Sequence, residues 1–67
     1  MALSYDPLWK KLIDKKMNKL ELAKAAGFST ATLAKLSKNE YVALAVLEKI
    51  CIALDCNIED VVEIKKN

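Results

Sequence analysis

Closely spaced start and stop signals for helices in the middle of this 67-residue chain limit its fold more than any other feature. Asn18 is a preferred helix cap, and Glu21, three residues later, completes a capping-box pattern. Small and apolar residues follow until Gly27, which readily adopts the left-handed conformation with which many helices end. These signals predict a short helix over residues 19–26.

A second helix has to begin almost at once, because Ser29 is another preferred cap. Asn39 marks its end, since asparagine tolerates a left-handed backbone better than most residues. The prediction is a helix over residues 30–38, joined to the preceding one by the tight turn at residues 27–29. Two short helices joined in this way have the spacing of a helix-turn-helix.

Three further helices are predicted from apolar residues at helical spacing and from caps. The first starts at Asp6-Pro7, an acidic cap followed by proline, and the last is capped by Asn57 with Asp60 three residues later. The apolar stripes of the first and fourth helices consist of Leu8, Trp9, Leu12 and Ile13, and of Leu44, Leu47, Ile50, Cys51 and Leu54. Residues 62–64 are expected to be extended. The predicted fold is all-α, a single compact domain over 1–67 with five helices at about 7–16, 19–26, 30–38, 44–54 and 58–62.

The residue types exclude several kinds of site. Histidine is absent and cysteine occurs twice, so the common zinc sites with four Cys or His ligands cannot form. Cys51 and Cys56 are poorly spaced for a strain-free disulfide, and we expect thiols. Without histidine an obvious nucleophile–base pair is missing, and so short a chain has little room for a deep pocket. We therefore expect no enzyme, metal, cofactor or small-molecule ligand.

Charge is distributed unevenly along the chain. Residues 1–38 hold eight lysines and three acidic residues, whereas residues 39–67 hold three lysines and six acidic residues. This division predicts one surface that faces a polyanion and another that faces away from it. The sequence shows neither a secretory signal nor an apolar stretch long enough for a bilayer, so we expect a cytoplasmic protein without a membrane partner.

The predicted helix over residues 30–38 has two chemically different sides. At about 100° per residue, Leu33 and Leu36 lie on one side and would face a core. The other side has lysines, a hydroxyl group and two alanines but no acidic residue: Thr30, Ala31, Ala34, Lys35 and Lys38. Such a slim, acid-free face suits the major groove of double-stranded DNA.

Two kinds of DNA contact follow from these side chains. Hydroxyl groups bond base edges, alanine methyl groups touch thymine methyl groups and lysine donates to guanine, so base contacts are expected from Thr30, Ala31, Ala34 and Lys35. Helix starts attract phosphate, and a lysine at a helix end can reach the DNA backbone. Phosphate contacts are therefore expected from Lys19, Ser29 and Lys38.

Residues 18–39 resemble the helix-turn-helix of the Cro and phage-repressor-like superfamily, also called the XRE family. The family pattern is matched by Leu22, Ala23, Gly27, Ser29, Thr32, Leu33 and Leu36. The segment LEKICIALDCNIEDVVEI is similar to the fourth and fifth helices of that family. The segment SYDPLWKKLIDKKM is similar to the start of its very short stand-alone regulators, so the similarity covers nearly the whole chain.

The resemblance implies a five-helix, phage-repressor-like domain whose third helix enters the major groove, in a transcriptional regulator that is expected to be a repressor. Carried over by position, it implies base contacts from Thr30, Ala31, Ala34 and Lys35 and backbone contacts from Lys19, Ser29, Lys38 and Asn39. The chain departs from the family pattern at Ala43, where a polar cap or proline is common. That helix start should be weaker by about 1 kcal/mol.

Apolar residues outside the predicted stripes suggest a partner surface: Leu20, Val46, Ile52, Ala53, Val62 and Ile64. A twofold homodimer would bury them and would match two DNA half-sites. The alternative is a protein-interaction module of the same fold, antitoxin-like or an adaptor, without strong DNA binding. Salt dependence separates the two, because phosphate binding weakens steeply as salt rises.

Overall fold

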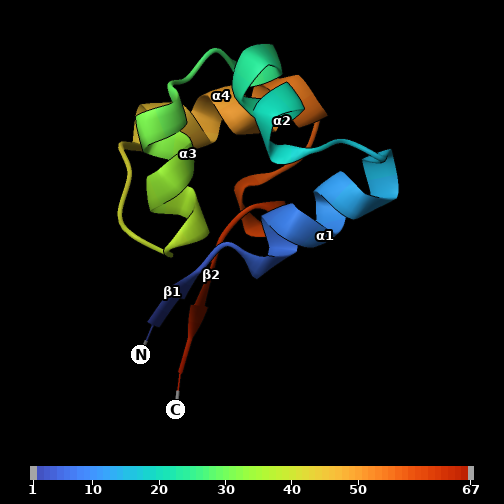
Figure 1. Ribbon diagram of the computed structural model, residues 1–67. Helices are drawn as coiled ribbons and strands as arrows, with labels where there is room; N and C mark the ends of the chain where they lie inside the picture. Colours follow the sequence, from blue (N-terminus) through green and yellow to red (C-terminus); the bar gives the residue numbers. More distant parts are fainter. Residues whose placement is uncertain (1, 67) are drawn as a thin grey trace.

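Four α-helices and a small sheet make up the computed structural model, which describes residues 2–66 (Figure 1). The helices are α1 (Asp6–Lys15), α2 (Lys19–Ala26), α3 (Thr30–Ser37) and α4 (Leu44–Leu54), followed by a 3₁₀ turn, η1 (Ile58–Asp60). The strands β1 (Ala2–Ser4) and β2 (Glu63–Lys65) come from the two ends of the described chain. Within residues 2–66 no helix has the length and apolar character needed to cross a bilayer.

The fifth predicted helix, 58–62, is wrong, because the chain makes only the 3₁₀ turn η1 there. Asn57 and Asp60 do form the expected capping box, in which the Asn57 N–H donates to Asp60 Oδ2 at 3.1 Å. After η1 the backbone becomes extended. Val61 is fully buried, and the residues after Val62 pair with β1. Side chains branched at Cβ favour this extended backbone over another helical turn.

The sheet corrects the all-α expectation. β1 and β2 pair in antiparallel fashion, with Leu3 opposite Ile64 and Ala2 opposite Lys65. An extended backbone was predicted for residues 62–64, and β2 begins at Glu63, inside that range. Nothing in the sequence predicted β1, because its pairing partner lies at the other end of the chain.

The start of α1 differs from its prediction. Tyr5 rather than Asp6 occupies the cap position, and Asp6 is the first helical residue, with Pro7 in the first turn. Ser4 Oγ accepts the Asp6 N–H at 3.2 Å, which satisfies one of the free donors at this helix end. The Asp6 carboxylate instead accepts a hydrogen bond from Lys65 Nζ at 2.8 Å, which links α1 to β2.

The core is one apolar cluster. All four helices contribute to it, together with Tyr5 before α1 and Val61 after η1. Its buried members are Tyr5, Leu8, Leu12, Leu22, Leu36, Leu47, Ile50, Leu54 and Val61. Most of them are leucines on one side of a helix, as the spacing predicted. Because α2 packs against both α3 and α4, the helix-turn-helix is fixed to the rest of the domain from behind.

The apolar stripes are narrower than predicted. Leu8 and Leu12, one turn apart on α1, are buried, but Ile13 is 74% exposed. Leu44, the first residue of α4, is 71% exposed, although Leu47, Ile50 and Leu54 of the same stripe are buried. Ile13 lies about 100° around the helix from Leu12, past the elements that cover α1.

The sequence predicted a weak start for α4. The structure agrees, because the cap residue Ala43 provides no side-chain hydrogen bond to the first turn.

Cys51 and Cys56 are free thiols, each half-buried near the C-terminal end of α4. Burial raises the pKa of the Cys51 thiol, and the neighbouring Cys56 raises it further. Because the thiolate is the reactive form, Cys51 is expected to be a poor nucleophile at neutral pH.

Candidate nucleic-acid interface

Hydrogen bonds within a few residues of one another define α2. Asn18 Oδ1 accepts the Glu21 N–H at 2.8 Å, and Glu21 Oε1 accepts the Asn18 N–H at 2.9 Å, so the predicted capping box is confirmed. Gly27 ends the helix with a φ of 80°, a left-handed conformation that costs glycine little. The bounds of α2 are therefore those predicted, 19–26.

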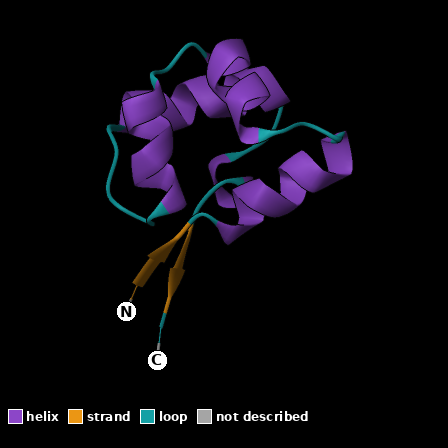
Figure 2. Cartoon of the chain, viewed as in Figure 1, coloured by secondary structure: helices purple, strands orange, loops and turns teal. Residues whose placement is uncertain are grey.

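The turn after Gly27 leads directly into α3. Ser29 Oγ accepts the Thr32 N–H at 3.2 Å, so Ser29 is the predicted cap. The helix ends at Ser37, one residue earlier than predicted, and Asn39 has the expected left-handed backbone with a φ of 57°. The arrangement is a helix-turn-helix, in which α2 and α3 are joined by a three-residue turn (Figure 2).

A pair of hydrogen bonds to Tyr5 holds the C-terminal end of α3. The Tyr5 N–H donates to Asn39 Oδ1 at 3.1 Å, and the Tyr5 hydroxyl donates to the Glu40 carbonyl at 2.8 Å. Tyr5 is itself 1% exposed, so these bonds join the end of α3 to the core and to the start of α1. Sequence reasoning missed Tyr5, because nothing near it in the sequence points to residues 39 and 40.

α3 presents two different sides, as predicted. Leu36 is fully buried and Leu33 is half-buried, which fixes the direction in which the helix faces the core. The side that carries the predicted base contacts is open to solvent, and all four of its residues are exposed: Thr30, Ala31, Ala34 and Lys35. α3 lies at one edge of the molecule (Figure 1).

The residues predicted to contact the DNA backbone are also exposed: Lys19, Ser29, Lys38 and Asn39. They lie at the start of α2 and at the two ends of α3, bordering the exposed side of that helix. No acidic residue occurs in α3, and the next one along the chain is Glu40. The region therefore combines exposed lysines with helix-start amides, both of which attract phosphate.

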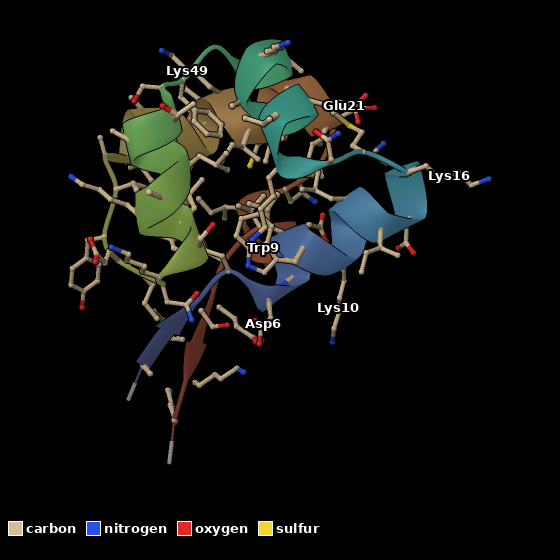
Figure 3. The ribbon with its side chains drawn as sticks, in the orientation of Figure 1. Asp6, Trp9, Lys10, Lys16, Glu21 and Lys49 are labelled. Atoms are coloured by element: carbon tan, nitrogen blue, oxygen red, sulfur yellow. The ribbon has the colours of Figure 1, made fainter. Side chains whose placement is uncertain are left out.

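Lys19 is held in place by contacts with two other helices. Its Nζ lies 4.3 Å from the centroid of the Trp9 ring and donates to Ser37 Oγ at 3.3 Å. Figure 3 shows Trp9 on the side of α1 that faces α2 and α3, while Lys10 points to the opposite side. Trp9 was predicted only as a core residue. Its contact with the Lys19 ammonium group could not be predicted from the sequence, because the two residues lie on separate helices.

Comparison with known proteins agrees with this geometry. No match is found among curated proteins. Among solved structures, the crystal structure of the transcriptional regulator VanUg is similar to the chain, with a TM-score of 0.89 and 52% identity over 92% of this chain and 83% of that one. A family profile described as the Cro/C1-type HTH DNA-binding domain matches residues 7–67. The chain therefore belongs to the family of Cro/C1-type helix-turn-helix DNA-binding domains.

Proposed function

We propose that this DNA-binding transcriptional regulator is a repressor that binds double-stranded DNA sequence-specifically by placing α3 in the major groove. The exposed, acid-free side of α3 is the observation that carries the proposal. Leu36 anchors the opposite side in the core, and Tyr5 holds the C-terminal end through two hydrogen bonds. A helix fixed in this way can enter a groove without the loss of conformational entropy that a mobile segment would suffer on binding.

Base readout is assigned to four residues: Thr30, Ala31, Ala34 and Lys35. The two alanines keep this side of α3 slim, which permits close approach to base edges and contact with thymine methyl groups. Lys35 lies within α3, on its exposed side, and can donate to guanine O6 and N7. It is the one long donor in the set, so most of the sequence preference should depend on it.

Backbone contacts are assigned to Lys19, Ser29, Lys38 and Asn39. Lys19 contacts Trp9 and Ser37 through its ammonium group, which places that group beside the start of α2 and the end of α3. Asn39 keeps its amide nitrogen as a donor for phosphate while its Oδ1 accepts the Tyr5 N–H. A regulator of this kind would act in the cytoplasm, where DNA is accessible and thiols such as Cys51 stay reduced.

The test compares alanine variants of three exposed lysines. A binding-site selection from random duplex DNA first gives the preferred sequence, and affinities are then measured on this sequence and on mutated ones. Lys35→Ala should cost about 1–3 kcal/mol at one base position and relax the preference there. Lys38→Ala should weaken binding to all sequences alike and lower the salt slope by about one. Lys10→Ala is the matched control, because Lys10 points away from α3 (Figure 3).

Two results would contradict the proposal. The division of roles fails if Lys35→Ala and Lys38→Ala have the same effect on every sequence. DNA binding itself fails if the wild-type chain ignores duplex DNA at low salt. A protein-interaction module would give that second result, and its partner binding would depend little on salt.

We also propose that the protein acts as a homodimer. Of the residues expected at a partner surface, Leu20, Ile52 and Ile64 are between 53% and 74% exposed. Val46 and Val62 are instead half-buried against the core, so they contribute little to any partner surface. A twofold dimer that covered any one of these exposed side chains would read two half-sites, as is usual for regulators of this type.

A further inference from the structure

The two cysteines of the chain come together at the C-terminal end of α4. Cys51 is in the last turn of that helix, and Cys56 follows two residues after its end at Leu54. On a continued helix, residues five apart would lie about 140° apart around the axis and roughly 7.5 Å apart along it. The helix stops first, because Asp55 has a left-handed backbone with a φ of 51°. The chain therefore turns back toward the last turn of α4.

This turn has the backbone hydrogen bonds of a Schellman motif. The Cys56 N–H donates to the Cys51 carbonyl at 3.0 Å, and the Asp55 N–H donates to the Ile52 carbonyl at 3.4 Å. In such a motif the side chains of the first and last residues frequently make an apolar contact across the turn. Here both of these residues are cysteines, so the contact joins two thiols.

The surroundings of the thiols agree with this contact. Both side chains are half-buried and pack against the apolar core. Burial raises the pKa of the Cys51 thiol most, and the charge and side-chain hydrogen bonding of Cys56 raise it further, which requires the two sulfur atoms to be close. Poor spacing for a disulfide was expected from the sequence, whereas the folded turn holds the pair together. Little backbone movement is then needed to reach disulfide geometry.

We propose that Cys51 and Cys56 form a reversible intramolecular disulfide when the protein meets a low-molecular-weight disulfide such as oxidised glutathione. In a reducing compartment both residues remain thiols, which is their state in the structure. The bond forms as the oxidant rises, and it cross-links the end of α4 in a domain short enough to gain stability from one cross-link. The inference goes beyond the proposed DNA contacts, which do not use either cysteine.

The chemistry consists of two thiol–disulfide exchanges. The Cys56 thiol loses its proton to water, and the thiolate attacks one sulfur of oxidised glutathione, so that a mixed disulfide forms and one glutathione leaves. The Cys51 thiolate then attacks the Cys56 sulfur and releases the second glutathione. The protein loses two protons and two electrons, and one oxidised glutathione becomes two reduced ones. The first attack is assigned to Cys56, because the raised pKa of Cys51 leaves less of it as thiolate.

The cross-link leaves the DNA-binding side of the domain in place. The loop that it closes holds only the end of α4 and the turn before Asn57, the cap of η1. η1 packs against α1 and α4, so the region that gains order is the junction of these three elements. None of the residues assigned to base or backbone contacts lies within 51–56. We therefore expect oxidation to raise stability and to leave α3 unchanged.

Equilibration of the full chain with mixtures of reduced and oxidised glutathione measures the pair directly. Mass spectrometry of the acid-quenched protein should show a monomer that has lost the mass of two hydrogen atoms. The same equilibration in urea gives the value for the unfolded chain. For a loop of this length, the folded chain should favour the disulfide about 30-fold more strongly than the unfolded chain does. Because the measurements close a thermodynamic cycle, oxidation should shift the unfolding equilibrium by the same factor.

Cys51→Ser and Cys56→Ser are the matched controls, and circular dichroism checks that both fold. Cys51→Ser should stop at the mixed disulfide of Cys56 with glutathione, Cys56→Ser should react more slowly, and neither should gain resistance to urea on oxidation.

Three results would overturn the site. The wild type yields only mixed disulfides or covalent dimers, the folded and unfolded chains favour the disulfide equally, or oxidation lowers the resistance to urea. Amide NMR shifts test whether the effect is local. Changes on oxidation should be confined to the end of α4, η1 and their neighbours in α1, and changes throughout α3 would contradict the proposal.

Discussion

Replacing Leu36 by alanine tests how α3 is held against the core. Leu36 is the one fully buried residue of that helix, and its side chain packs among the leucines and isoleucine of the other helices. Truncation removes the buried methyl groups and leaves a cavity behind. The surrounding helices can close such a space only in part, because the side chains that line it are fixed by their own packing.

The expected cost follows from the burial of the side chain. Full burial of a leucine contributes about 1.5–3 kcal/mol, and the cavity brings the usual cost of Leu→Ala in a core to about 2–5 kcal/mol. With Leu36 at 0% exposure, about 3 kcal/mol is expected. A domain of 67 residues has a total stability of roughly 3–10 kcal/mol. The loss of about 3 kcal/mol should raise the ratio of unfolded to folded chains about 150-fold.

Urea denaturation followed by far-UV circular dichroism measures this loss. Leu33→Ala is the internal control, because Leu33 lies on the same helix but is only half-buried, and it should cost about 1 kcal/mol. Leu44→Ala, at a 71% exposed leucine, should change the free energy of unfolding by less than about 0.5 kcal/mol. Equal losses for Leu33→Ala and Leu36→Ala would show that burial of Leu36 is not what holds α3, and the reasoning would fail.

Three further predictions use the hydrogen bonds and pKa shifts of the domain. Asn18→Ala removes the cap of α2 and should lower the free energy of unfolding by about 1 kcal/mol in urea titrations, whereas an unchanged midpoint would contradict the role of the cap. The hydrogen bond from Lys65 lowers the pKa of the Asp6 carboxyl group, so the pair stabilises the fold above the ordinary pKa of aspartate and this contribution is lost as pH falls through the lowered value. Lys65→Ala should return the Asp6 pKa to its ordinary range in an NMR titration. Burial raises the pKa of Tyr5, so the stability that its neutral hydroxyl provides should decline as pH rises above about 10, and Tyr5→Phe should remove that decline in thermal melts.

The helix-turn-helix was predictable because the signals that define it are local. The capping box of Asn18 and Glu21, the left-handed Gly27 and the Ser29 cap all act through backbone atoms within four residues. α2 accordingly has its predicted bounds, and α3 ends one residue early. The exposed side of α3 could be predicted for the same reason, since helical spacing places Leu36 opposite the lysines. The DNA contacts of that side remain predictions.

Contacts between distant segments were not predictable. Asp6 carries no local sign that Lys65 will bind it, and Tyr5 carries none that its N–H will meet Asn39. The exposure of Ile13 was missed because spacing gives the direction of an apolar stripe but not the width of the surface that covers it. The last predicted helix failed because pairing with β1 competes with another helical turn.

The sequence alone determined the four helices, the turn between α2 and α3, and the side of α3 that faces solvent. These features depend on helix propensity, caps and apolar spacing within a few residues. Interactions between near neighbours therefore decide where each helix begins, ends and faces the core. Only the tertiary structure decided that the two ends of the chain form a sheet, that Tyr5 ties the end of α3 to the core, and that Lys19 rests on Trp9. Each of these contacts joins segments far apart in the chain, so its free energy exists only once the core has brought those segments together.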